Sequence, residues 1–220
     1  ITKLNLDGKI LYQKSVIEIL TENKILPENY AVTMALANHL DPIHLNDIEP
    51  ALTDTKYWKK GDVFLSIRTL SSIIHFRPSS NKIINYITGP FAMQHDVDFV
   101  SDKEISIFNN NNFPIESDYS EVLIYNFETK TFRKLFDDQL KKENFKTYSQ
   151  GELQILNDGS LMVEEQNHGR IIFFNNQGEK EWEFVNKDLK GDINRITWSS
   201  IIEDEIFIKN FKLLLKNKKC

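Results

Sequence analysis

Apolar and polar residues alternate along most of this chain, in short segments separated by turn residues. The pattern is clearest late in the sequence, where residues 151–156 lead through Asn157-Asp158-Gly159 into residues 160–165. Asp-Gly between two alternating segments is a strong β-hairpin signal, because glycine readily adopts the positive φ of a tight turn. Two more such segments follow at residues 170–174 and 179–184. We therefore expect four short antiparallel strands in this region.

Four such strands within about forty residues have the period and content of one blade of a β-propeller. Residues 43–90 fit the same pattern, with strands expected at 43–49, 62–68, 72–77 and 82–88. Residues 95–136 fit it again, with strands expected at 95–100, 104–109, 121–127 and 131–135. The sequence thus predicts an all-β fold, a β-propeller of four-stranded antiparallel blades, in a single domain over residues 1–220.

Both ends of the chain look like incomplete blades. Residues 1–13, with the turn Leu6-Asp7-Gly8-Lys9, resemble an outer pair of strands, and residues 193–215 resemble inner strands. Propellers often close by pairing strands from the two termini, which removes exposed sheet edges. The chain begins with Ile1 rather than Met. We expect a processed product or a fragment, which is a partial or C-terminal portion of a six-bladed propeller.

Two segments interrupt the strand pattern and predict short helices. Residues 15–20 begin with Ser15 and Glu18 at capping-box spacing, followed by apolar residues at helical positions. A second helix is expected over residues 138–144, capped by Asp137 or Asp138. Both are interpreted as additions to a β frame.

Composition excludes several function classes. With 220 residues, 40% of them hydrophobic, the chain can bury a substantial core, and its net charge of −5 argues against a nucleic-acid partner. The basic run at residues 212–219 is interpreted as a solvated tail. No window approaches the roughly 18 consecutive apolar residues of a membrane span, so we expect no membrane contact by this segment. The single cysteine, Cys220, excludes an intrachain disulfide and a cysteine metal site.

Two histidines and an arginine occupy related positions in successive repeats. His44 and His95 each open an innermost-type strand, and Arg68 ends the strand that follows His44. Equivalent positions in a radial repeat fold converge on one axis, so we expect the three at one end of the central channel. A neutral imidazole is a competent nucleophile, while a guanidinium and a second imidazole stabilise a tetrahedral oxyanion. This set predicts transfer of a sulfuryl or phosphoryl group without a metal or other cofactor.

The same residues also allow a purely structural interpretation. His44 and Asn46 could hydrogen-bond neighbouring loops instead of a substrate. Arg68 could pair with one of the nearby acidic residues, Asp47, Glu49 or Asp96. In that case the fold is a non-catalytic propeller that binds a ligand or a protein at its channel mouth, because one fold hosts many functions.

A metal site is a further alternative. The candidate ligands are His44, His95 and either Asp96 or Asp98. Their spacing matches no compact metal-binding motif, so we expect no metal. Isolated histidines are weak indicators of function, and we interpret His39, His75 and His168 as structural.

Several segments together indicate a family. They are His44-Leu45-Asn46-Asp47-Ile48-Glu49-Pro50, Gly61-Asp62-Val63-Phe64-Leu65-Ser66-Ile67-Arg68, Gly89-Pro90, Gln94-His95-Asp96-Val97-Asp98-Phe99 and Gly169-Arg170-Ile171. With them, from about residue 41 to residue 186, the chain resembles the bacterial arylsulfotransferase (aryl-sulfate sulfotransferase) β-propellers. The family has another active-site histidine in an earlier blade, which this chain lacks.

The resemblance implies an enzyme that moves a sulfuryl group from an aryl sulfate ester to a phenolic acceptor, through a covalent sulfohistidine and without a nucleotide cofactor such as PAPS. By motif, His95 corresponds to the histidine that is sulfated, Arg68 to the sulfate-clamping arginine, and His44 with Asn46 to the flanking catalytic and substrate-binding groups. The resemblance also implies a periplasmic protein, or one anchored in the membrane and facing the periplasm.

Overall fold

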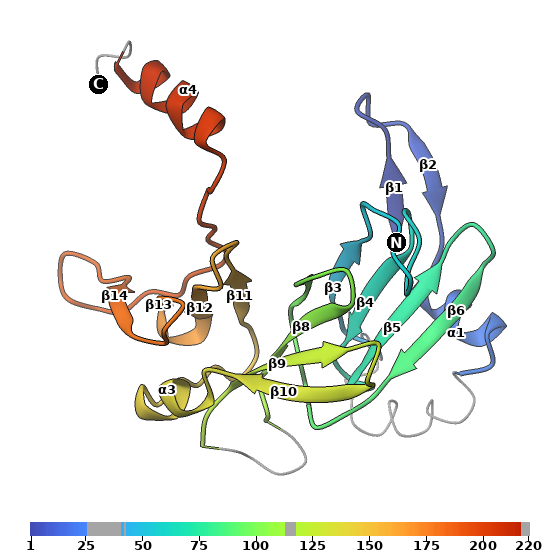
Figure 1. Ribbon diagram of the computed structural model, residues 1–220, viewed down its shortest axis with the longest axis horizontal. Coiled ribbons are helices and arrows are strands. Elements are labelled where there is room, and N and C mark those ends of the chain that lie inside the picture. The colour runs from blue at the N-terminus through green and yellow to red at the C-terminus, as the bar shows by residue number, and fades with distance from the viewer. Residues whose placement is uncertain (26–40, 42, 113–117, 217–220) are drawn as a thin grey trace. The chain divides into compact units, whose positions relative to one another are not determined.

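The computed structural model describes residues 1–25, 41, 43–112 and 118–216 (Figure 1). The chain divides into two compact units, Ile1–Gly151 and Glu152–Cys220. The first unit contains all the candidate site residues. That residues 1–220 form a single propeller domain stays a prediction. His39 and Cys220 lie outside the described residues.

Two four-stranded sheets form the body of the first unit, as far as the structure describes it. The first sheet consists of β3 (Leu45–Pro50), β4 (Val63–Ile67), β5 (Ser72–Arg77) and β6 (Lys82–Ile87). The second consists of β7 (Val97–Phe99), β8 (Glu104–Asn109), β9 (Glu121–Asn126) and β10 (Thr131–Leu135). In both, each strand pairs antiparallel with the next one along the chain, which is the topology of a propeller blade. The eight predicted strands are confirmed, with bounds that differ by at most two residues.

The second unit holds one sheet of the same type. It consists of β11 (Glu152–Ile155), β12 (Leu161–Glu165), β13 (Arg170–Phe174) and β14 (Lys180–Val185), in that order. The short 3-10 helix η1 (Gln166–His168) ends at Gly169, where an added Cβ would lie 1.9 Å from the Asn194 carbonyl oxygen. Glycine is required there because the backbones approach so closely. The predicted all-β frame of four-stranded antiparallel blades is confirmed.

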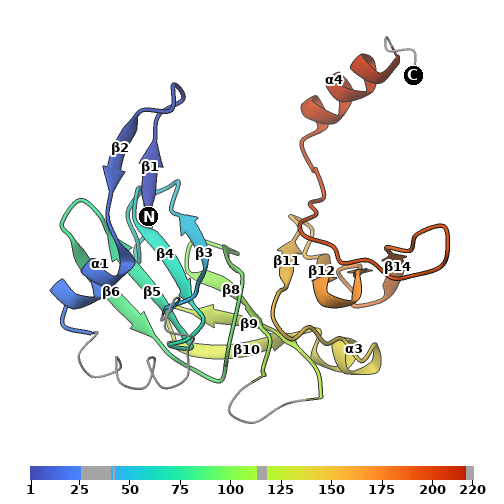
Figure 2. The same cartoon turned by 180° about the vertical axis from the view of Figure 1, so that it is seen from behind.

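In the described part of the first unit, a hairpin and two helices accompany the sheets. β1 (Thr2–Leu4) and β2 (Ile10–Gln13) form the hairpin (Figure 2). The helices are α1 (Val16–Glu22) and α3 (Asp137–Lys142). At the start of α1 the Ser15 backbone N–H donates to Glu18 Oε2 at 3.1 Å, as the capping-box spacing predicted. Both helices were expected from the sequence.

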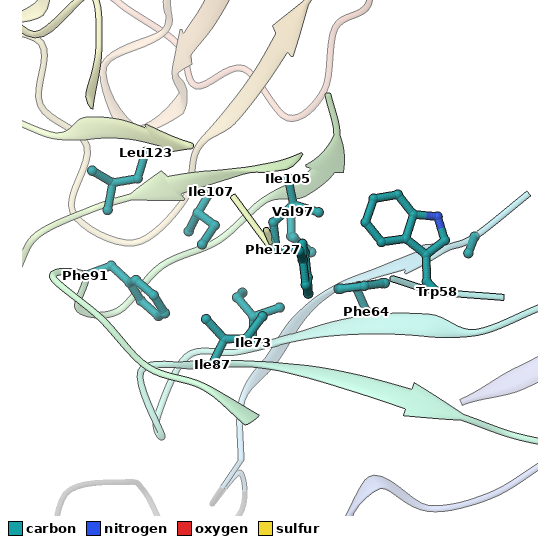
Figure 3. Packing of buried hydrophobic residues seen from close by; sticks show 11 residues of the cluster. Trp58, Phe64, Ile73, Ile87, Phe91, Val97, Ile105, Ile107, Leu123 and Phe127 are labelled. Atoms are coloured by element: carbon teal, nitrogen blue, oxygen red, sulfur yellow. The ribbon is translucent and has the colours of Figure 1, made fainter. Parts of the chain in front are cut away.

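The two faces of the first sheet are covered by different partners. Phe64 and Ile73 face the second sheet and pack with a buried cluster that includes Trp58, Val97 and Ile107 (Figure 3). The next residues along β4 and β5 point the other way and pack with Ile19 and Leu20 of α1. Side chains alternate between the faces of a strand, so a blade buried on both faces needs apolar residues along its whole length. This accounts for the apolar runs in β4 and β5.

The expectation of inner strands at residues 193–215 is wrong. The structure has irregular backbone up to Asp204 and then the helix α4 (Glu205–Lys216). Phe207, Phe211 and Leu214 recur at spacings of four and three, which places them on one helix face. The Asp204 side chain accepts a hydrogen bond from the Phe207 backbone N–H at 2.8 Å and so caps the helix. The sequence has neither glycine nor proline in this segment, so nothing there favours a hairpin turn.

The helix α4 includes part of the basic run. Lys212 and Lys216 are exposed residues of this helix, and residues 217–219 are outside the described part of the chain. Across the described residues, no helix is both long enough and apolar enough to cross a membrane.

His75 belongs to a buried polar network within the first sheet. Its Nε2 lies 2.8 Å from Asp62 Oδ2, and Arg77 donates to both carboxylate oxygens of Asp62, at 2.8 and 2.7 Å. Asn85 Nδ2 lies 2.9 Å from His75 Nδ1, so the ring accepts there and carries its hydrogen on Nε2. Burial lowers the pKa of His75, while its bond to Asp62 opposes this. His75 is therefore a neutral structural residue, as the sequence indicated.

The same network makes stability depend on pH. Burial raises the pKa of Asp62, but the hydrogen bonds from Arg77, the Lys59 backbone and His75 outweigh this and bring it down to about 2. An aspartate in an unfolded chain has a pKa of about 4. The stabilisation is therefore fully present above about pH 4, and is lost as the pH falls toward about 2.

We expect Asp62→Asn to destabilise the first unit at neutral pH by about 1–3 kcal/mol, the typical cost of losing hydrogen bonds to a buried charged group. The loss of stability between about pH 4 and pH 2 should also become smaller. Urea unfolding at a series of pH values measures both effects. Exposed Asp102→Asn is the control and should keep the wild-type profile. If the stability of Asp62→Asn fell between about pH 4 and pH 2 as much as that of the wild type, the role of Asp62 in this dependence would be contradicted.

Candidate functional site

The candidate residues are brought together by the ends of two antiparallel strand pairs. Arg68 is the first residue after β4, and its backbone N–H donates to the His44 carbonyl at 3.0 Å. Asn110 is the first residue after β8, and in the same hairpin the His95 N–H donates to the Phe108 carbonyl at 3.0 Å. Antiparallel pairing therefore places Arg68 beside His44, and Asn110 beside His95.

His95 is a partly buried imidazole with a hydrogen-bonded ring. Its Nδ1 lies 2.6 Å from Asn110 Oδ1. Burial lowers the pKa of His95, the bond to Asn110 opposes this, and the positive charge of Arg68 lowers it further. Hydrogen bonds with the backbone of Ser149 and Met93 act in the opposite direction without reversing the shift. The ring is neutral at neutral pH, and Arg68 lies close enough for its charge to act on it.

Arg68 has an unsatisfied buried N–H. Its Nε is buried and has no hydrogen-bond partner among the residues the structure describes. Burial lowers the pKa of the guanidinium, and the neighbouring Asp41 carboxylate raises it. An arginine stays protonated under such conditions, so the site keeps a positive charge. A buried donor without a partner costs free energy, and an anionic ligand would recover it.

Asp47, one of the acidic residues expected as possible partners of Arg68, makes contacts with the backbone. Asp47 accepts hydrogen bonds from the backbone N–H of Ile48 at 2.7 Å and of Val97 at 3.1 Å. Asp41, which the sequence did not single out, is the carboxylate that acts on Arg68. The pairing of Arg68 with Asp47, Glu49 or Asp96 stays a prediction.

His44 and Asn46 are both held by hydrogen bonds. His44 Nδ1 lies 2.6 Å from Asp41 Oδ2, and its backbone N–H donates to Asp41 Oδ1 at 3.0 Å. The His44 side chain is 42% exposed, so it remains accessible to a ligand. Asn46 Nδ2 donates to the Gln94 carbonyl at 2.7 Å, next to His95. Asn46 thus positions the chain before His95, and its role in binding substrate stays a prediction.

The backbone at this end of the two sheets is strained. His44, Ser71 and Met93 have φ values of 49°, 44° and 58°, in the left-handed region that side chains other than glycine seldom adopt. The Met93 N–H donates to Ser71 Oγ at 3.4 Å, which links two of these loops. Such a conformation costs on the order of 1 kcal/mol or more per residue.

A group of carboxylates lies on the inner strands of the same two sheets. Burial, Asp98 and Asp47 raise the pKa of Glu49 to about 7, and burial and Asp47 raise that of Asp98 to about 6.

In the described part of the chain, no set of three or more His, Cys, Asp or Glu side chains is placed to hold a metal ion. The candidate metal set of His44, His95 and Asp96 or Asp98 is therefore not assembled as a metal centre.

Asn110 and Asp41 are the site residues that sequence reasoning missed. Asn110 belongs to an unbroken run of asparagines at residues 109–112, which begins at the last residue of β8. Asp41 precedes His44 by three residues but stands next to a segment without a strand pattern.

The comparisons with known proteins decide the family. The model of the arylsulfotransferase (ASST) family matches residues 1–187. The chain belongs to the arylsulfotransferase family. This confirms the resemblance to that family which the sequence indicated. No curated protein matches the chain.

Two solved structures are similar at low sequence identity. One is a protein of unknown function from Bacteroides caccae, with 13% identity and a TM-score of 0.43, covering 60% of this chain and 47% of that one. The other is the WD40 β-propeller domain of Doa1, with 11% identity and a TM-score of 0.42, covering 68% of this chain and 46% of that one. This arylsulfotransferase-family chain thus spans less than half the length of either.

The electrostatic coupling between Arg68 and His95 is directly testable. Arg68→Gln should raise the pKa of His95, because a nearby positive charge disfavours the protonated imidazole. Arg68→Lys keeps the charge and should change the pKa of His95 less. Nuclear magnetic resonance titration of histidine-labelled protein measures this shift. The exposed Arg133→Gln is the control, and an unchanged His95 pKa in Arg68→Gln would contradict the proximity of the two groups.

Proposed function

We propose that this chain transfers a sulfuryl group from an aryl sulfate ester to a phenolic acceptor, with His95 as the nucleophile. One observation carries the proposal: a neutral imidazole, hydrogen-bonded to Asn110, lies within the electrostatic reach of a guanidinium whose buried Nε–H has no partner among the described residues. A sulfate ester offers both an electrophilic sulfur and anionic oxygens, so it suits a nucleophile next to an unpaired cationic donor. Membership of the arylsulfotransferase family supports the same reaction class.

The reaction we propose has two displacement steps. A ring nitrogen of His95 attacks the sulfur, the bond from sulfur to the aryl oxygen breaks, and the phenolate leaves and takes up a proton. The acceptor phenol then loses its proton and attacks the sulfur of the sulfohistidine, and the nitrogen–sulfur bond breaks. The free imidazole is restored and no oxidation or reduction occurs. A covalent intermediate of this kind divides one difficult transfer into two easier ones.

The neighbouring groups have complementary roles in this proposal. Arg68 binds the negatively charged sulfuryl oxygens and holds the group in place during transfer. His44, whose side chain stays accessible, stabilises the same group from the first sheet. Asn46 donates a hydrogen bond to the Gln94 carbonyl and so holds the backbone that leads into His95. No nucleotide cofactor enters the scheme, and a periplasmic location remains part of the proposal.

Exposure to a phenyl sulfate donor should leave a sulfuryl group on His95. Intact-mass spectrometry should show the added mass of one SO₃, lost again when a phenol is supplied. His95→Asn should form no adduct, whereas His168→Asn, changed at a histidine in the second unit, should form it as the wild type does. An adduct that persists in His95→Asn would place the nucleophile elsewhere. Donor binding without any adduct would favour the non-catalytic binding propeller.

Arg68→Lys should slow transfer strongly although it keeps the charge. Lysine lacks the planar pair of donors that matches two sulfuryl oxygens, and losing one such donor typically costs about 10²–10³-fold in rate. The rate of phenol release from the donor measures the effect. Arg133→Lys, an exposed arginine on β10, should keep the wild-type rate. Equal rates in the two variants would remove Arg68 from the proposed site.

A further inference from the structure

Asn110 joins the candidate nucleophile to the buried backbone behind it. Its side chain is fully buried. Its Nδ2 donates to the Thr147 carbonyl at 3.0 Å and to the Gln150 carbonyl at 2.8 Å. Its Oδ1 lies 2.6 Å from His95 Nδ1. The amide thus uses both of its hydrogens on one side and its oxygen on the other.

These contacts permit only one orientation of the amide. Carbonyl oxygens accept hydrogen bonds and cannot donate them, so the NH₂ group must face Thr147 and Gln150. A flipped amide would place its oxygen against two carbonyl oxygens and leave them unpaired, which is costly in a buried position. The Oδ1 atom therefore faces His95, and it can only accept.

The orientation of Asn110 decides where His95 carries its hydrogen. A ring nitrogen 2.6 Å from an acceptor oxygen must donate, so the neutral ring has its hydrogen on Nδ1. The lone pair is then on Nε2. We propose that Asn110 is a positioning residue that fixes this tautomer of His95 and thereby makes Nε2 the atom that attacks sulfur. The catalytic part of this inference rests on the proposed function, whereas the tautomer does not.

An amide suits this position better than a carboxylate. An aspartate would favour the protonated imidazolium, which has no lone pair with which to attack. The neutral amide orients the ring without adding a negative charge beside it. The ring can therefore remain a nucleophile close to the positive charge of Arg68.

The strand repeat gives Asn110 a position equivalent to that of Arg68. Each is the first residue after the second strand of its blade, and each stands beside the histidine that precedes the first strand. In the first blade this position supplies the cation of the site. In the second blade it supplies the group that orients the nucleophile.

The tautomer of His95 can be measured without an assay of enzymatic activity. Two-dimensional nuclear magnetic resonance of ¹⁵N-histidine-labelled protein, above the pKa of His95, should show the hydrogen on Nδ1 in the wild type. Asn110→Ala should lose that preference. The control is Asn112→Ala, from the same asparagine run, because Asn112 donates to the Tyr148 carbonyl instead. A wild-type ring with its hydrogen on Nε2 would overturn the proposal, even if every variant failed to fold.

A second readout tests the consequence for the reaction. In Asn110→Ala, sulfuryl-adduct formation should slow by roughly tenfold to a hundredfold, the scale of a misplaced reacting group. In Asn110→Asp, the pKa of His95 should rise, and adduct formation should require a higher pH. Wild-type rates in Asn110→Ala despite an altered tautomer would overturn the positioning role. A wild type with the Nδ1–H tautomer but no adduct on any histidine would instead refute the proposed function alone.

Discussion

The packing of two sheets against each other around Phe64 is the constraint on which the candidate site depends. Arg68 belongs to the first sheet and His95 to the second, so neither sheet alone brings the guanidinium to the imidazole. The buried cluster of Phe64, Trp58 and Val97 holds the sheets together. Polar contacts then fix their relative register: Gln94 Nε2 donates to Ser66 Oγ at 3.2 Å and to the Ser72 carbonyl at 3.0 Å. A site built across such an interface is placed by apolar burial and aligned by hydrogen bonds.

Two histidines of the first unit show how one kind of neighbour produces opposite tautomers. His75 and His95 each have a partner asparagine at Nδ1, and burial lowers the pKa of both rings. Asn85 presents its NH₂ group, so His75 carries its hydrogen on Nε2 and directs it to Asp62. Asn110 presents its oxygen, so His95 carries its hydrogen on Nδ1. The first ring bonds through both nitrogens to Asn85 and Asp62, whereas the second is oriented by Asn110 and is the nucleophile of the proposed reaction.

Much of the blade structure follows from local pattern. The Asp158-Gly159 turn and the alternation around it predicted β11 and β12. The same pattern of four short strands then predicted the strands around Phe64. The failure at residues 193–215 has a physical cause, because short apolar segments fit both periods until length and capping decide between them. There Asp204 caps a helix, and the apolar residues follow a helical spacing. Asn110 was missed because an asparagine run beside a strand is typical of a turn as well as of a site.

The sequence by itself determined the strand order, the four-stranded blades and the family. It also indicated that His44, Arg68 and His95 lie at one end of the sheets. These depend on alternation, turn residues and motif spacing, which are local along the chain. Only the tertiary structure decided that Arg68 has a buried N–H without a partner among the described residues, that Asp41 is its acidic neighbour, and that Asn110 sets the His95 tautomer. Those properties depend on burial and on hydrogen-bond direction between segments far apart in sequence, which no local pattern specifies.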